Sequence, residues 1–198
     1  MKNVNTFVIV CISVLVLSSC SKKTDDNNNG NSQNTILRTW NFISMDVKHE
    51  LIEERNEGFS KWRTVTKTEY VTIKNGGTAT FDSDKITSEN LAYEVNAVEK
   101  SYYYRNDSLL KTEEAPLRFT VLHSGLLSDY TMTGTDSLQM NSGPIKIKPN
   151  ATSQPVTIKL QFENDKVYLV YKILRKYIPN STVTETETAN VLITLQKK

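Results

Sequence analysis

Residues 156–162 read VTIKLQF, in which apolar and polar side chains strictly alternate. After the polar residues 163–166 (ENDK), the alternation resumes with Val167, Leu169, Tyr171 and Ile173. Successive side chains of a strand point to opposite faces, so this pattern gives each strand one apolar face and one wet face. The two runs therefore predict an antiparallel pair of half-buried strands joined by a tight turn.

The same pattern continues outward from this pair in both directions, for example at Val191, Ile193 and Leu195 near the C-terminus. Residues 51–56 (LIEERN) are the best helix candidate, and residues 35–39 are expected to form one short turn. We expect eight to ten strands, at roughly 40–50, 61–74, 78–83, 90–104, 109–122, 129–133, 137–141, 155–163, 166–176 and 184–196.

Turn residues between these runs predict a series of hairpins. Residues 75–77 (NGG) separate the alternating runs 70–73 and 78–81, and glycine accepts the positive φ that tight hairpin turns require. Further turns are predicted within 130–140 and within 91–111. Consecutive hairpins favour an all-β, antiparallel up-and-down meander that closes into a barrel, because closure hides the two sheet edges. A two-sheet sandwich is the alternative.

A closed meander brings its first and last strands together, so the strand that begins near Trp40 is expected to pair with the one that ends near Leu195.

The chain has 198 residues and a formal net charge of +2, which gives no support to a nucleic-acid partner. Two Cys and two His leave almost nothing with which to build a structural metal site, and we expect no cofactor.

The N-terminus has the pattern of a secretory signal peptide. Lys2 precedes an apolar run at residues 7–17, which is shorter than the roughly 20 residues needed to span a bilayer. The run ends in Ser18-Ser19-Cys20, which resembles a bacterial lipobox. In such precursors the cysteine receives lipid and becomes the first mature residue, so residues 1–19 are interpreted as the signal peptide and Cys20 as the lipidation site.

Residues 20–34 contain Cys20 followed by a polar, Asn-rich segment, which is predicted to be a disordered tether. Stable anchoring takes two or more acyl chains, palmitate among them, so the mature protein is expected to be tethered to the membrane through this lipid. Ser21 stands where many bacterial lipoproteins carry an inner-membrane retention Asp, which favours the outer membrane. Whether the protein faces the periplasm or the cell surface stays open.

Three segments of the predicted body, residues 35–198, carry a family resemblance. Residues 37–44, with Trp40, are similar to the opening strand of lipocalin-like domains. Residues 70–81 and 130–140 are similar to two later elements of these domains. With the lipobox and the Asn-rich tether, the chain resembles the lipocalin-like lipoproteins of Bacteroidetes. The resemblance implies an eight-stranded cup that holds a small apolar ligand.

Aromatic residues are the candidate ligand-binding groups. Trp40 is interpreted either as the floor of a ligand pocket or as a core side chain that closes one end of the barrel. Tyr102 and Tyr104 share one face of their strand, opposite to Tyr103, and such a pair of rings suits a glycan or a partner protein.

Two serines are candidate modification sites. Ser108 and Ser137 lie in Asp-Ser-Leu tripeptides within predicted turns, and these resemble the O-glycan acceptor of Bacteroidetes periplasmic proteins. A bulky glycan is tolerated at such exposed positions.

No catalytic constellation is recognisable. His49 and His123 have neither catalytic nor metal-ligand spacing, and a nucleophile elbow is missing around Ser124. We therefore expect a membrane-anchored, non-catalytic binding module for a small hydrophobic molecule or a glycan. The alternative is an accessory protein that docks onto another envelope protein. Small barrels are either hollow or solid, so a filled interior would favour the docking alternative.

Overall fold

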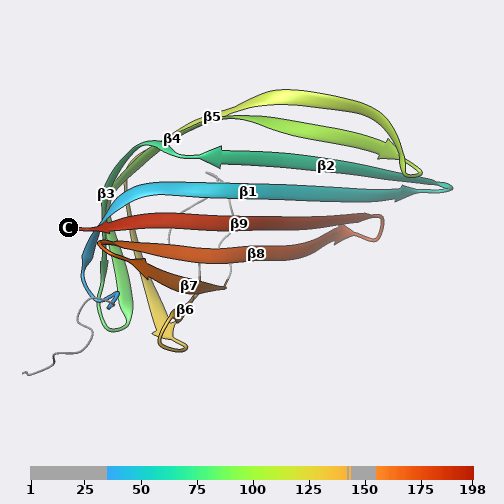
Figure 1. The fold of residues 1–198 in the computed structure, drawn as a ribbon. Coiled ribbons are helices and arrows are strands. Elements are labelled where there is room, and N and C mark those ends of the chain that lie inside the picture. Colours follow the sequence, from blue (N-terminus) through green and yellow to red (C-terminus); the bar gives the residue numbers. More distant parts are fainter. Residues whose placement is uncertain (1–34, 142, 144–154) are drawn as a thin grey trace, which may run out of the picture. The chain divides into compact units, whose positions relative to one another are not determined.

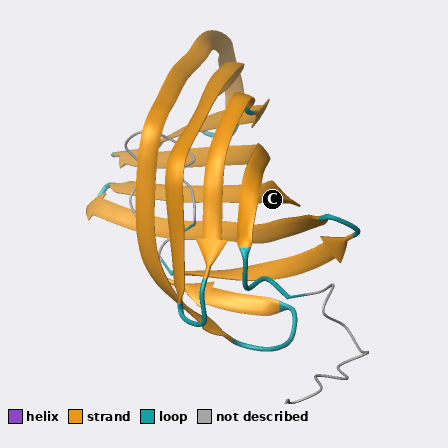
Figure 2. Ribbon diagram, turned by 90° about the vertical axis from the view of Figure 1, so that its left-hand side faces the viewer, coloured by secondary structure: helices purple, strands orange, loops and turns teal. Residues whose placement is uncertain are grey.

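The computed structural model describes residues 35–141, 143 and 155–198, and every regular element in this part of the chain is a strand (Figure 2). The predicted signal peptide 1–19 and the predicted tether 20–34, with Cys20, lie outside the described residues. The described part of the chain contains no helix that is long and apolar enough to cross a membrane.

Nine strands form one antiparallel sheet. Their bounds are β1 Thr39–Glu57, β2 Ser60–Val71, β3 Ile73–Phe81, β4 Lys85–Arg105, β5 Ser108–Met132, β6 Ser137–Met140, β7 Val156–Glu163, β8 Lys166–Asn180 and β9 Val183–Lys197.

Strands β2 and β3 act as one strand that is interrupted at Thr72, because both pair with β1 on one side and with β4 on the other. The interruption is held to β1 by two hydrogen bonds. The Thr72 amide donates to the Met45 carbonyl, and the Met45 amide donates to Thr72 Oγ1, both over 2.9 Å. The side-chain hydroxyl thus replaces a backbone partner that the break removes.

The sheet curls round into a ring. Strands β3 to β9 pair in chain order, and β9 pairs with β1, where Phe42 lies opposite Leu195 and Val47 opposite Val191. This confirms the predicted pairing of the first and last strands and differs from the two separate sheets of a sandwich. The shortest strand of the ring is β6, whose four residues pair with β5 on one side and with β7 on the other.

The ring encloses the hydrophobic core. Apolar side chains that alternate along each strand point inward and are almost fully buried, as the sequence pattern predicts. The largest fully buried side chains are Trp40, Tyr93, Phe81, Met45, Ile86, Leu138, Met140, Ile158, Leu169, Ile193, Leu195 and Val47.

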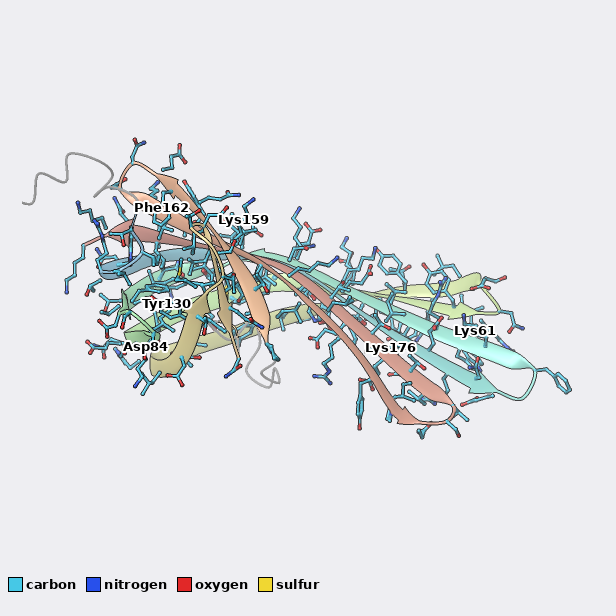
Figure 3. The ribbon with its side chains drawn as sticks, turned by 90° about the horizontal axis from the view of Figure 1, so that it is seen from below. Lys61, Asp84, Tyr130, Lys159, Phe162 and Lys176 are labelled. Carbon is cyan, nitrogen blue, oxygen red and sulfur yellow. The ribbon has the colours of Figure 1, made fainter. Side chains whose placement is uncertain are left out.

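Six strands continue beyond the ring as an extension of the sheet, visible in Figure 1 where β1, β2, β8 and β9 run past β3, β6 and β7. Its strands lie in the order β5, β4, β2, β1, β9, β8, so β5 and β8 are its outermost strands. The extension comprises residues 48–57, 60–69, 97–105, 108–117, 172–180 and 183–190. Ten residues of strand project about 30 Å. Figure 3 shows Lys61 and Lys176 on the extension, away from Asp84 and Tyr130 on the ring.

The helix predicted at residues 51–56 is wrong, because these residues belong to β1. They pair with β2 on one side and with β9 on the other, so both neighbours supply backbone hydrogen bonds. Tertiary pairing of this kind overrides a weak local helix preference.

The hairpin predicted at residues 75–77 is also wrong, because these residues lie inside β3, where the register with β4 shifts on both sides of Gly76. Gly77 has a φ of +95°, and a Cβ there would lie 2.5 Å from the Asn90 carbonyl oxygen. The glycines therefore serve a bulge and a close approach of two strands. The hairpins predicted within 130–140 and within 91–111 are confirmed.

Candidate functional site

Trp40 lies in the core of the ring, with 2% of its surface exposed. Its indole Nε1 donates a hydrogen bond to the Ile36 carbonyl over 2.8 Å, which satisfies the polar atom of the buried ring. The Arg38 guanidinium lies 5.5 Å from the ring centroid. This environment is that of a packed core side chain.

The three tyrosines 102–104 lie on β4 in the extension, and they alternate between its faces as the sequence predicts. Tyr102 is opposite Val65 of β2, and Tyr104 has the Arg63 guanidinium 4.4 Å from its ring centroid. Tyr103 points to the other face, where the Lys111 ammonium lies 4.3 Å from its ring. All three rings are partly buried.

The two candidate O-glycosylation sites begin strands directly after turns. Ser108 is the first residue of β5 and is exposed. Ser137 is the first residue of β6, is partly buried, and donates from Oγ to Asp136 Oδ1 over 3.0 Å. Both serines therefore belong to the strands that follow the turns and not to the turns in which the sequence placed them.

The interior of the ring contains a group of buried tyrosines. Burial raises the pKa of Tyr70, Tyr93 and Tyr171 above the usual value, to about 12 for Tyr93. The Tyr93 ring meets Phe42 and Phe119 edge-to-face, with centroids 6.0 and 6.3 Å apart. These phenols are neutral core side chains at physiological pH.

At the boundary between ring and extension, His49 Nε2 lies 2.9 Å from Glu187 Oε1. The other Glu187 oxygen is 3.8 Å from Arg175 Nη1. The arrangement neutralises a carboxylate that is mostly withdrawn from water. Among the residues that the structure describes, no group of three or more His, Cys, Asp or Glu side chains is placed to hold a metal ion.

The outer face of β1, β8 and β9 carries a hollow of about 470 Å³, next to Lys48, Lys172 and Leu192. Tyr171, the one aromatic residue among its described lining, has its side chain buried in the core. The described lining therefore offers no exposed aromatic ring on which a ligand could stack.

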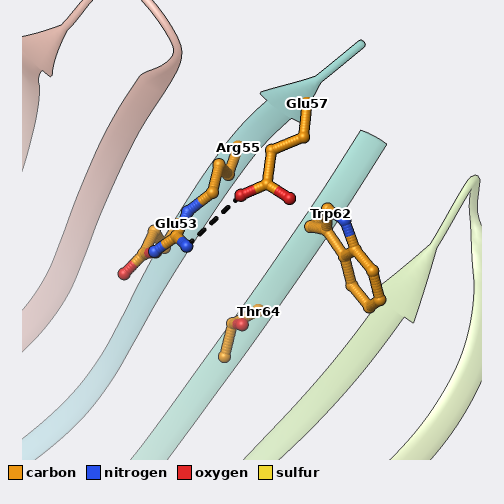
Figure 4. A pocket seen from close by; sticks show the side chains of 5 residues that line it. All are labelled: Glu53, Arg55, Glu57, Trp62 and Thr64. Carbon is orange, nitrogen blue, oxygen red and sulfur yellow. Dashed lines mark hydrogen bonds and ion pairs between the residues drawn. The ribbon is translucent and has the colours of Figure 1, made fainter. Parts of the chain in front are cut away.

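A second hollow, of about 210 Å³, lies on the opposite face of the extension near its tip. Glu53, Arg55 and Glu57 of β1 line one side, and Trp62 and Thr64 of β2 line the other (Figure 4). Strand alternation places these five side chains on one face. Arg55 Nη2 lies 3.2 Å from Glu53 Oε1, and Arg55 Nη1 lies 3.5 Å from Glu57 Oε1.

Trp62 has an arginine as its cross-strand neighbour on each side, and the guanidinium of one of them, Arg105, lies against its ring. Arg55 of β1 lies directly opposite Trp62 on one side, and Arg105 of β4 lies directly opposite it on the other. The Arg105 guanidinium lies 5.2 Å from the indole and donates from Nη2 to Ser60 Oγ over 3.1 Å. The ring is thus fixed by its neighbours while part of its surface stays exposed.

A third hollow, of about 200 Å³, shares Trp62 and Thr64 with the second one and is also lined by Tyr103, Leu110 and Lys111. Tyr103 lies directly opposite Thr64. We call Glu53, Arg55, Glu57, Trp62, Thr64 and Tyr103 the Trp62 site. It joins an aromatic surface to carboxylates, a guanidinium and a hydroxyl, which together can bind a polar ligand that also has an apolar face.

Sequence reasoning did not single out Trp62. The available signal was a lone tryptophan within residues 60–69, a strand whose other side chains are mostly polar. A large aromatic residue on a mostly polar strand has no place in an alternating core pattern, and tryptophan is enriched among the residues that dominate binding at interfaces.

Comparisons with models of protein families, with curated proteins and with solved structures found no match for this chain.

Proposed function

We propose that this chain is a lipid-anchored, non-catalytic docking protein of the outer membrane that engages another envelope component through its extension. The ring serves as the base, a lipocalin-like barrel in this proposal. The anchor is the lipid on Cys20, and the tether 20–34 separates it from the body.

The observation that carries the proposal is the dense burial of the described side chains that point into the ring. Trp40, Phe81 and Tyr93 are among the large side chains that meet there, each with almost no exposed surface. A carrier of a small hydrophobic molecule needs an enclosed space for it. Side chains packed inside the ring occupy the space that such a ligand would need, and they therefore favour docking over the carrier function.

The extension supports the proposal because it adds surface that the core does not need. One of its faces carries two cross-strand ion pairs, Lys67–Glu50 at 3.0 Å and Lys61–Glu54 at 2.8 Å. Hydrogen bonding to the glutamates raises the pKa of both lysines. Most side chains of these six strands are partly or fully exposed, so the extension presents them to a partner well away from the base.

Site-specific photocrosslinking in intact cells tests the docking function. A photoreactive amino acid at Thr64 or Tyr177 places the crosslinker on the extension, and one at Thr194 places it on the ring as a matched control. We expect adducts with an envelope component from the two extension positions and far fewer from the control. Equal adducts from all three positions would contradict the proposal.

Native mass spectrometry of the protein purified from its own cells tests the carrier alternative. The docking proposal expects the mass of the lipidated chain alone or with a macromolecular partner. A small molecule that stays bound until the ring unfolds would instead support the carrier function.

A further inference from the structure

We infer that the Trp62 site binds a neutral oligosaccharide chain. This inference rests on the proposed docking function and names the chemistry that the extension would recognise. It starts from the exposed part of the Trp62 indole, which lies between two lined hollows of similar size. Pyranose rings have a C–H face that packs on an indole, and their edges carry hydroxyl groups that need polar partners.

The polar partners are present beside the indole. The side chains of Glu53, Arg55 and Glu57 are 40%, 50% and 55% exposed. They are therefore hydrated in the free protein, and ligand hydroxyl groups would replace this water. Each carboxylate uses one oxygen on Arg55 and keeps the other available as an acceptor. Hydrogen bonds from hydroxyl groups to carboxylates are stronger than those between neutral groups.

The size of the hollows favours a chain of small units. Volumes of about 210 and 200 Å³ are below the roughly 300–1,000 Å³ of enclosed sites for drug-sized ligands. Both hollows border Trp62 and Thr64, so successive rings of one chain can occupy them with the indole between. A single compact ligand would use only one of them.

The charge of the site favours a ligand without charge. The carboxylates of Glu53, Glu57 and Glu185, which lies directly opposite Glu53, are matched in number by the cationic groups of Arg55, Arg105 and Lys111, so the lining has no net charge to attract an acidic glycan. A cationic group on the indole competes with Arg105, whose guanidinium already lies 5.2 Å from the ring. A neutral chain faces neither difficulty.

The site is also organised before binding. Arg55 is held by two carboxylates, and Arg105 is held by Ser60, so both side chains that flank Trp62 have partners in the free protein. Ordering flexible side chains opposes binding, and side chains that are already held in the free protein lose little further freedom.

The test uses the full lipidated chain in a detergent that has no sugar headgroup. The probes are neutral hexasaccharides of glucose, mannose, galactose and xylose, with hexagalacturonate and pentalysine as charged comparisons. Isothermal titration calorimetry measures affinity. Tryptophan fluorescence reports on Trp62, because Trp40, the other tryptophan, is buried in the core.

We expect at least one neutral hexasaccharide to bind saturably and to change the fluorescence. Trp62→Ala should weaken binding at least 10-fold, Glu57→Gln less, and Trp62→Phe should retain most of it because the stacking surface remains. Tyr177→Ala is the matched control, an exposed aromatic position on the same face outside the site, and it should bind as the unchanged protein does.

Three results would overturn the inference: no saturable binding of any neutral hexasaccharide, equal binding by Trp62→Ala and the unchanged protein, or Trp62-dependent binding of pentalysine alone. Circular dichroism of each variant shows whether it is folded, and Trp62→Phe keeps the test decisive if Trp62→Ala is not. Crosslinking from the extension to an envelope component would leave the docking function in place even then.

Discussion

Replacing Gly77 with alanine should destabilise the body through two effects at one position. The φ of +95° at Gly77 is unfavourable for any residue with a Cβ. The added Cβ would also lie 2.5 Å from the Asn90 carbonyl oxygen and 2.7 Å from that of Glu89, both backbone atoms that move only if β4 moves. The close approach of β3 and β4 would therefore be lost.

The magnitude follows from these two contributions. A left-handed conformation costs about 1–2 kcal/mol for a residue with a Cβ. Local backbone strain of the kind needed to relieve the contact costs about 1–3 kcal/mol. We expect the free energy of unfolding to fall by about 2–5 kcal/mol, the sum of the two contributions and a large part of the roughly 5–15 kcal/mol typical of a domain. At about 2–4 °C per kcal/mol, Tm should fall by roughly 4–20 °C.

Gly76→Ala is the matched control, because it lies next to Gly77 in the same strand and a Cβ there meets nothing within 4 Å. We expect its stability to be unchanged or slightly raised, since alanine restricts the unfolded chain. Both variants are measured by urea and thermal unfolding followed by circular dichroism. The reasoning is refuted if Gly77→Ala unfolds at the same urea concentration as the control.

Three further predictions concern the core, the buried phenols and the anchor. Leu138→Ala on β6, where the side chain is fully buried, should lower the free energy of unfolding by about 2–5 kcal/mol in urea denaturation, whereas Leu174→Ala on the exposed extension should change it by less than about 0.5 kcal/mol. Burial raises the pKa of the Tyr93 phenol from 10.0 to about 12, so its contribution to the free energy of unfolding should be fully present below pH 10 and be lost as the pH rises through about 12. Urea midpoints that stay constant over this pH range would contradict the assignment. Cys20→Ala should abolish membrane association in cell fractionation while the body still folds, and a variant that stays in the membrane fraction would exclude the proposed anchor.

The sequence was most informative where one face of a strand is buried. Residues 156–162 and the alternation of Val191, Ile193 and Leu195 mark strands of the ring, because burial on one side imposes a period of two. The pairing of the first and last strands could also be anticipated, since a meander of this length hides its edges by closing.

The pattern fails where the same strands leave the ring. Residues 51–56 continue β1 into the extension, where both faces are wet and apolar side chains no longer alternate with polar ones. Pairing with β2 and β9 decides their conformation, and that pairing is invisible in a local window. Residues 75–77 failed for a related reason, because a bulge and a hairpin both select glycine.

The candidate site could be predicted only in part. The alternation of Tyr102, Tyr103 and Tyr104 between two faces follows from strand geometry, and the register confirms it. Trp62 could not be joined to Arg55 and Arg105 from sequence, because their proximity depends on two strand pairings that the turns alone do not specify. Sheet register had to be known first.

The outermost strands of the extension affect how the protein behaves under crowding. A membrane-held protein is concentrated in two dimensions, where exposed strand edges would otherwise pair between neighbours and aggregate. Pro116 lies on β5 and Pro179 on β8. Each proline lacks an amide hydrogen, so a strand added at either edge would lack one backbone hydrogen-bond donor there. The prolines thus disfavour strand addition at both outer edges of the extension, which the proposed lipid anchor would otherwise promote by concentrating the molecules.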